Sequence, residues 1–165
     1  MQGEMSGEGT ESSMILQSRL TSGDTPVQGD VPGCPGVGCF EVSTGPDFEG
    51  SFRTEWMEAV PELDYILKTR VTGLEAGTRY YYRLLYGRDT TSVEMGETCT
   101  FRTLPGKDRL DEVSFVVVTG MNYEYFHFGR NRSRTSGIPR GDSTAYLGED
   151  KDLGYPALET ILEMD

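Results

Sequence analysis

Long apolar runs are missing from this chain of 165 residues. No stretch approaches the roughly 18 to 20 consecutive apolar residues that a membrane-spanning helix needs, so we expect no membrane span. The chain opens with the polar, glycine-rich stretch MQGEMSGEGTESS, which cannot be the apolar centre of a secretory signal peptide. The residues themselves therefore leave the cellular compartment open.

Positive charge is also scarce. The chain has 15 Lys and Arg residues against 27 Asp and Glu residues, which gives a formal net charge of −12. The average field of such a surface repels the phosphate backbone of DNA or RNA. We therefore expect no nucleic-acid partner.

Cysteine is limited to Cys34, Cys39 and Cys99. The three lack the paired C-x-x-C spacing of a structural zinc site, which argues against metal binding through them. Cys34 and Cys39 bracket a Pro-Gly-Val-Gly loop, and the alternatives for them are a disulfide, in an oxidising compartment, or free thiols. Cys99 lies on the apolar side of an expected strand, which favours a buried and inert thiol.

What the chain does contain is typical of a loop-rich β protein. Apolar residues make up 36% and charged residues 25%, with 21 glycines and 8 prolines. Short segments with a two-residue apolar period follow one another from Ser12 onward, and no helical period occurs before Thr103. The side chains expected to face inward are Met14, Leu16, Leu20, Phe40, Val42, Tyr65, Leu67, Val71, Tyr80, Tyr82, Leu84, Tyr86, Val93, Met95, Cys99 and Phe101.

This pattern predicts an antiparallel β-sandwich of the immunoglobulin or fibronectin type III kind. A more specific sign is the spacing of Leu74, Gly77, Thr78 and Tyr80. It resembles a tyrosine corner, in which a phenol near the start of a late strand bonds back to the backbone of the preceding turn. The alternative is that these tyrosines are ordinary strand-forming aromatics.

The pattern changes after residue 104. We predict a sandwich over residues 1–104, a polar linker over 105–112 and a second, incomplete domain over 113–165. The run VSFVVVTG is continuously apolar, as in a strand buried on both faces. The final stretch GYPALETILEMD has Pro156 near a helix start and a helical apolar stripe. A strand, a loop and a helix are the first unit of an α/β layer.

Four segments, in this order, resemble the start of alkaline phosphatase D-like (PhoD-like) enzymes: DYILKTRVTGLEAGTRYYYRLLYG, TFRTLPG, VSFVVVTGMNYEY and GYPALETIL. In that family an immunoglobulin-like sandwich precedes a metallophosphoesterase domain that hydrolyses phosphate mono- and diesters at an iron- and calcium-containing centre. The resemblance implies a mainly β chain, with the sandwich followed by a truncated first strand-loop-helix of the catalytic domain. It also implies a phosphate ester as substrate and a periplasmic or extracellular location.

The metal-ligand core of such enzymes is missing from this chain. There is a single histidine, and the D-x-H, G-N-H and G-H-x-H signatures of metallophosphoesterases do not occur. In many family members a cysteine ligand follows the first catalytic strand, at the position that Gly120 occupies here. Asn122 and Tyr123 are the candidates for lining the site, and the alternative for Asn122 is an ordinary turn. Gly141 and Asp142 lie in a polar loop, which favours a loop aspartate over a ligand.

We therefore predict that this chain is the amino-terminal part of a metal-dependent phosphoesterase and is inactive by itself. No cofactor is expected in the fragment, and iron and calcium are implied for the intact enzyme. The alternative is a non-catalytic β-sandwich that binds or interacts with a partner and carries a degenerate tail. The sequence leaves the natural substrate and the oligomeric state open.

Overall fold

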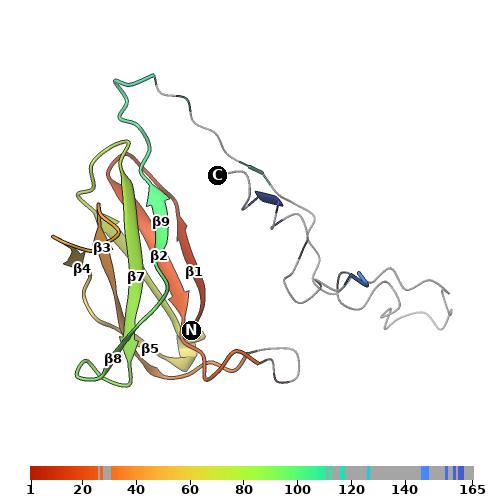
Figure 1. Ribbon diagram of the computed structural model, residues 1–165. Helices are drawn as coiled ribbons and strands as arrows, with labels where there is room; N and C mark the ends of the chain where they lie inside the picture. The colour runs from red at the N-terminus through yellow and green to blue at the C-terminus, as the bar shows by residue number, and fades with distance from the viewer. Residues whose placement is uncertain are drawn as a thin grey trace. The chain divides into compact units, whose positions relative to one another are not determined.

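The computed structural model divides the chain into two units, Met1–Val113 and Ser114–Asp165, which we describe separately. The first unit contains every named strand (Figure 1). The structure describes residues 1–25, 27, 31–110, 112, 116–117, 126, 146–148, 155, 158 and 160–161.

The first unit is a sandwich of two antiparallel sheets. One sheet has three strands in the order β1 (Gln2–Gly7), β2 (Ser13–Arg19) and β6 (Ile66–Thr72). The other runs in the order β4 (Phe52–Arg53), β3 (Gly36–Ser43), β7 (Arg79–Gly87) and β8 (Val93–Met95). Two further strands extend it: β5 (Met57–Ala59) pairs with β3, and β9 (Cys99–Arg102) pairs with β7. A short 3-10 turn, η1 (Pro61–Leu63), precedes β6.

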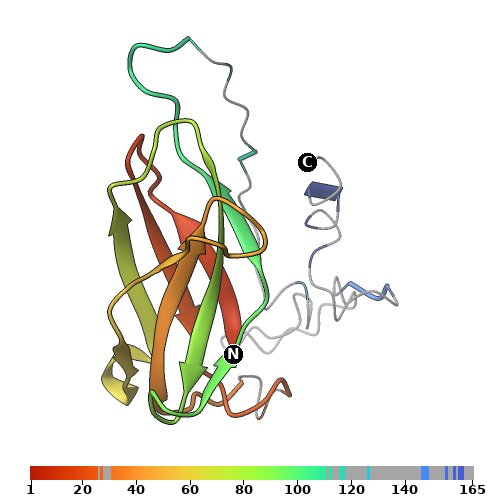
Figure 2. The ribbon, with the colours of Figure 1, turned by 60° about the vertical axis from the view of Figure 1, so that its left-hand side comes forward.

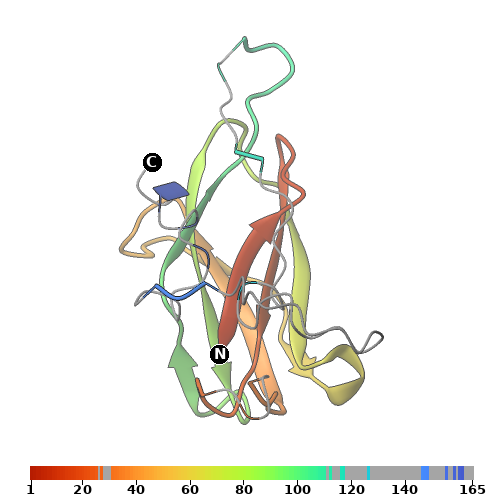
Figure 3. The ribbon, with the colours of Figure 1, turned by 90° about the vertical axis from the view of Figure 1, so that its right-hand side faces the viewer.

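The core lies between the two sheets, where the alternation of the sequence predicted it. Figures 2 and 3 show the two layers, the red and yellow strands forming one and the orange and green strands the other. Side chains from both layers are buried in a single cluster, so the prediction of an antiparallel sandwich is confirmed. The predicted core residues found buried are Met14, Leu16, Leu20, Phe40, Val42, Leu67, Val71, Tyr80, Tyr82, Leu84 and Phe101.

The tyrosine corner is confirmed as well. The Tyr80 hydroxyl accepts a hydrogen bond of 2.8 Å from the backbone N–H of Glu75. Gly77 adopts a positive φ of 63°, the left-handed region that favours glycine in tight turns. The ring of Tyr80 stacks on Phe101 with 5.4 Å between centroids. The corner thus fixes the turn between β6 and β7 to the core.

Strand β1 was not predicted. Its sequence, QGEMSG, has no apolar alternation, and the sequence placed the start of the first sheet at Ser12. In the structure β1 pairs antiparallel with β2, with Met5 opposite Gln17 and Gly7 opposite Ile15. Backbone pairing rather than side-chain pattern adds this strand, and the side-chain pattern was the only signal available from the sequence.

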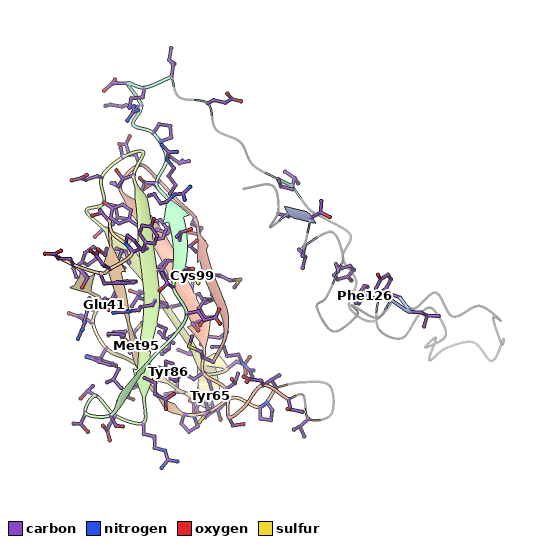
Figure 4. All side chains as sticks on the ribbon, viewed as in Figure 1. Glu41, Tyr65, Tyr86, Met95, Cys99 and Phe126 are labelled. Carbon is purple, nitrogen blue, oxygen red and sulfur yellow. The ribbon has the colours of Figure 1, made fainter. Side chains whose placement is uncertain are left out.

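The last predicted strand is two strands, and two of its residues face the other way. Leu85 of β7 lies opposite Met95, whereas Tyr82 lies opposite Cys99. Between these two pairs the chain advances by four residues, from Met95 to Cys99, but β7 advances by only three, from Leu85 to Tyr82. The extra residue forms a β-bulge. Gly96 lies at this bulge, and its N–H donates to the Leu84 carbonyl. Because one extra residue reverses the side-chain direction, Phe101 is buried while Met95, 64% exposed, lies outside (Figure 4). The expectation that Val93 and Met95 face the core was wrong.

All three cysteines are free thiols, so the alternative of a Cys34–Cys39 disulfide is not realised. Cys39 is fully buried, and its burial raises the pKa of its thiol. Cys99 is half-buried rather than buried, because it lies next to the bulge at the edge of the sheet, and desolvation raises its pKa too.

The second unit is described at only a few positions. Val116 and Val117, from the predicted buried strand, lie outside any strand and are 50% and 77% exposed. Leu158, Thr160 and Ile161 have helical backbone conformation and lie in the stretch for which a helix is predicted, but the helix itself stays a prediction. The rest of the predicted strand-loop-helix lies outside the described residues and stays a prediction. Within the described part of the chain, no helix is both long and apolar enough to cross a membrane.

Candidate functional site

The site residues predicted from the sequence are Gly120, Asn122 and Tyr123, and all three lie outside the described residues. Their roles stay predictions. Among the described positions, no three His, Cys, Asp or Glu side chains come together as the ligands of a metal ion would. The described residues therefore offer no metal site to compare with the iron and calcium that the resemblance implies.

Three aromatic residues of the second unit lie together. The rings of Phe126 and Tyr146 stack with 5.2 Å between centroids, and Tyr155 packs against Phe126 at 4.4 Å. The backbone N–H of Tyr146 donates to the Phe126 carbonyl at 2.9 Å. Phe126, labelled in Figure 4, is buried, with 8% of its surface exposed. These contacts bring residues from three places in the polar segment and the helix start into one small cluster.

The most elaborate polar cluster in the described part of the chain is centred on Glu41 of β3. Glu41 lies directly opposite Arg53 of β4 on one side and Arg83 of β7 on the other. Phe40 and Val42 point into the core, so Glu41 points to the outer face of the sheet. Its side chain is nevertheless only 5% exposed.

Both carboxylate oxygens of Glu41 are fully engaged. Arg53 donates from Nε at 3.0 Å and from Nη2 at 2.9 Å to Oε1, and the Ser51 hydroxyl donates to the same oxygen at 3.2 Å. Arg83 donates from Nε at 2.8 Å and from Nη2 at 2.6 Å to Oε2. Charge-assisted hydrogen bonds are stronger than bonds between neutral groups.

A loop closes over the cluster. The guanidinium carbon of Arg83 lies 4.0 Å from the centre of the Phe48 ring, in a cation–π contact. Phe48 is buried although it sits in a loop, and its φ of 58° is in the left-handed region. The Ser43 hydroxyl donates to the Glu49 carbonyl at 3.3 Å and holds the loop to β3. The outer face of the sheet is thus covered here by its own loop.

Burial and charge act in opposite directions on Glu41. Desolvation by itself would raise the pKa of the carboxyl group, but the hydrogen bonds and charges of Arg83 and Arg53 outweigh it, so the pKa lies below its ordinary value. The carboxylate stays ionised at neutral pH, and all its bonds are occupied. It is therefore suited to holding β3, β4, β7 and the loop together and not to accepting a proton from a substrate.

The sequence analysis did not identify this cluster. Alternation placed Glu41 and Arg83 on the outward sides of their strands, so each position was predictable. Their pairing depends on β3 and β7 being neighbours in register, and this follows from the sheet order. No pattern in the sequence indicates that Phe48 folds back over Arg83.

A second set of bonds fixes the point where the chain leaves the sandwich. The buried Thr103 hydroxyl donates to the Glu75 carbonyl at 2.6 Å and accepts from the Thr78 N–H at 2.9 Å. Leu104 follows, with its N–H donating to the Thr10 carbonyl and its carbonyl accepting from the Gly77 N–H. The polar linker thus starts from a rigid point.

Comparison with known proteins identifies the sandwich. The family model described as "PhoD-like phosphatase, N-terminal domain" matches residues 1–105. The solved structure of PhoD matches with 27% identity and a TM-score of 0.52, and the match covers 63% of this chain and 19% of that one. A search of curated proteins gives no match.

Two other solved structures are similar at lower scores. A human fibronectin type III domain, from fibronectin type III domain containing protein 3, matches with 14% identity and a TM-score of 0.45, over 66% of this chain and 88% of that one. The sensor domain of the anti-sigma factor RsgI4 of Pseudobacteroides cellulosolvens matches with 11% identity and a TM-score of 0.46, over 74% and 92%.

The extent of the family match decides the assignment. It covers the whole sandwich, from β1 to the end of β9 and the rigid point at Thr103. The match to PhoD spans about a fifth of that protein's length. The chain belongs to the PhoD-like phosphatase family, and its residues 1–105 are the N-terminal domain of that family.

Proposed function

We propose that this chain is the amino-terminal part of a metal-dependent phosphoesterase that hydrolyses phosphate mono- or diesters, and that it has no activity by itself. The observation that carries the proposal is the family match over residues 1–105. In this proposal the sandwich is a non-catalytic support, and residues 113–165 begin the catalytic domain. The intact enzyme works in the periplasm or outside the cell.

The sandwich's own chemistry fits a supporting role. Its principal polar cluster consists of Glu41 and two arginines that satisfy it completely, which leaves no free base or nucleophile there. The bonds of Thr103 and Leu104 give the following domain a fixed point of departure. These bonds lie within the sandwich and fit a domain whose role is structural.

The described residues do not form a binding site for the metal ions that the family uses. No described cluster has enough ligands. Gly120, which is predicted to take the position of the family's cysteine ligand, has no side chain with which to bind a metal. We derive no catalytic step through iron or calcium from this chain. The metal-binding residues of the intact enzyme are proposed to lie in its later catalytic segments.

The test compares two proteins. The 165-residue chain and the product of the complete reading frame that contains it are each incubated with bis-(p-nitrophenyl) phosphate and p-nitrophenyl phosphate, with and without added iron and calcium. We expect metal-dependent release of p-nitrophenol by the longer product and none by the chain.

Two results would overturn the proposal. Turnover by the 165-residue chain in proportion to its concentration would contradict its inactivity. A complete product that folds, binds its metals and hydrolyses neither ester would contradict the phosphoesterase assignment, and a non-catalytic module would then be the better description.

A further inference from the structure

Two turns at one end of the sandwich are bonded to each other. In the turn from β1 to β2, the Thr10 N–H donates to the Ser13 carbonyl at 2.9 Å, and the Ser12 N–H donates to the Thr10 hydroxyl at 3.1 Å. The Ser12 carbonyl accepts a bond of 3.0 Å from the N–H of Leu74, in the turn from β6 to β7. Figure 1 shows that the chain leaves β9 at this same end. The two turns therefore form one fixed surface beside the start of the linker.

The first residues of the linker bind to both turns. Leu104 donates its N–H to the Thr10 carbonyl at 3.0 Å and accepts from the Gly77 N–H at 2.9 Å, so it lies between the two turns. Three residues later, the Lys107 N–H donates to Oε2 of Glu11 at 3.2 Å. Glu11 belongs to the turn from β1 to β2, and a carboxylate is a strong acceptor for a backbone N–H. The linker is therefore attached to the sandwich at a second point beyond Leu104.

The segment between and after these two attachments is folded against the same turns. The Arg109 N–H donates to the Gly106 carbonyl at 2.8 Å, which closes a turn around Lys107. A Cβ placed on Gly106 would lie 3.7 Å from the Cβ of Ala76 and 3.8 Å from Oε2 of Glu11. Gly106 is therefore in van der Waals reach of one residue from each turn. The contacts that tie the linker to the sandwich extend in this way through residues 104–109.

We propose that residues 104–109 are a clamped segment, held by the two turns with Glu11 as the positioning residue, and not the beginning of a free linker. At about 3.3–3.6 Å per residue, a linker free over residues 105–112 could extend to roughly 26–29 Å, and one free only over residues 110–112 to roughly 10–11 Å. The clamp therefore shortens the tether from which the next domain starts. Its consequence for the intact enzyme, a catalytic domain kept close to the sandwich, rests on the proposed function.

Four variants separate the clamp from the stability of the sandwich. Glu11→Ala removes the acceptor for the Lys107 N–H, whereas Glu11→Gln keeps an oxygen that can accept the bond. Glu8→Ala is the matched control, because Glu8 is a nearby exposed carboxylate whose described partner is Arg70. Gly106→Ala fits without strain, since both neighbours of the new Cβ lie at ordinary contact distance. It also reduces the conformational freedom of the released segment, which favours the clamped state.

The measurement is the initial rate of trypsin cleavage after Lys107 in the 165-residue chain, followed by mass spectrometry, with a synthetic peptide of residues 102–112 as the unclamped reference. Cleavage of a segment that opens and closes rapidly follows the population of its open form. We expect the wild type to be cleaved at least roughly tenfold more slowly than the peptide. Glu11→Ala should speed cleavage by roughly fivefold, Gly106→Ala should slow it by roughly twofold, and Glu11→Gln should lie between the wild type and Glu11→Ala. Hydrogen exchange of β7 peptides should not change in any variant.

Three results would overturn the clamp. The first is cleavage of the wild type after Lys107 at the rate of the free peptide. The second is an equal acceleration by Glu8→Ala and Glu11→Ala, and the third is faster cleavage in Gly106→Ala. None of these measurements needs catalysis, so a failure of the clamp is distinguishable from a failure of the phosphoesterase assignment.

Discussion

At the scale of single residues, the Tyr80 corner and the Glu41 cluster are the main polar contacts of the sandwich that we describe. Only the first of them could be predicted from the sequence. The bond from the Glu75 N–H to the Tyr80 hydroxyl was predicted, because a tyrosine corner depends on residues only a few positions apart. The Glu41 cluster joins residues from three strands, with Arg53 and Arg83 on opposite sides of Glu41. Local spacing reveals the first contact, and only sheet order reveals the second.

The Glu41→Gln substitution tests the cluster. It removes the charge that both arginines face, and we expect the free energy of unfolding to fall by about 2 kcal/mol at pH 7, measured by urea denaturation. Glu8→Gln, which breaks an exposed ion pair with Arg70, is the matched control and should cost less than about 1 kcal/mol. Equal losses in the two variants would show that burial of Glu41 is unimportant.

The same residue should make stability depend on pH. The folded-state pKa of Glu41 is lowered from its ordinary value of 4.5, so the unfolded chain binds the proton more readily than the folded chain. The stabilisation is therefore complete above that value and is lost as the pH falls through the lowered folded-state pKa. Denaturation curves from pH 7 to pH 2 should show the difference between the wild type and Glu41→Gln shrinking below pH 4.5. A difference that stays constant would contradict the shift.

At the scale of elements, the bulge at Gly96 decides which side of a strand faces the core. The sequence has Val93, Met95, Cys99 and Phe101 at odd positions, which predicts one face. One extra residue between β8 and β9 places Met95 opposite Leu85 on the outer side, whereas Phe101 stays inside opposite Tyr80. Glycine, with no Cβ, is typical of such bulges, but its presence does not by itself locate one.

Alanine substitutions at the two ends of this segment should separate the two faces. Phe101→Ala removes a buried ring that contacts Tyr80 and Tyr82, and we expect a loss of about 3 to 5 kcal/mol in the free energy of unfolding. Met95→Ala removes an exposed side chain and should change it by no more than about 0.5 kcal/mol. Comparable losses measured by urea denaturation would place Met95 in the core and refute the bulge.

At the scale of the whole molecule, the sandwich has a complete core of its own. All the residues of the main core cluster lie between Met1 and Phe101, in the first of the two units. The second unit, where it is described, has Val116 and Val117 exposed and a small aromatic cluster around Phe126.

Truncation after Val113 tests whether the sandwich is independent. We expect residues 1–113 to unfold in a single cooperative transition, with a Tm within about 2 °C of that of the 165-residue chain, because the core is unchanged. We also expect the shorter protein to aggregate less. Calorimetry and light scattering measure the two properties, and a large drop in Tm would show that the later residues stabilise the sandwich.

The sequence by itself determined the class of fold and most of its core. Alternation depends on each strand's own residues, so it identified β2, β6 and β7 and the inward direction of side chains such as Leu16 and Leu84. The order of its segments also indicated the PhoD-like family, which the match over residues 1–105 confirmed. The predicted roles of Gly120, Asn122 and Tyr123 stay predictions, because those residues lie outside the described part.

Only the tertiary structure decided what depends on neighbours. Strand β1 exists because β2 offers a backbone edge, although its own side chains give no signal. Glu41 is buried because β4, β7 and the loop with Phe48 meet around it. Met95 faces outward because a bulge changes the register against β7. Each of these results from contacts between residues far apart in the chain, which a local pattern does not contain.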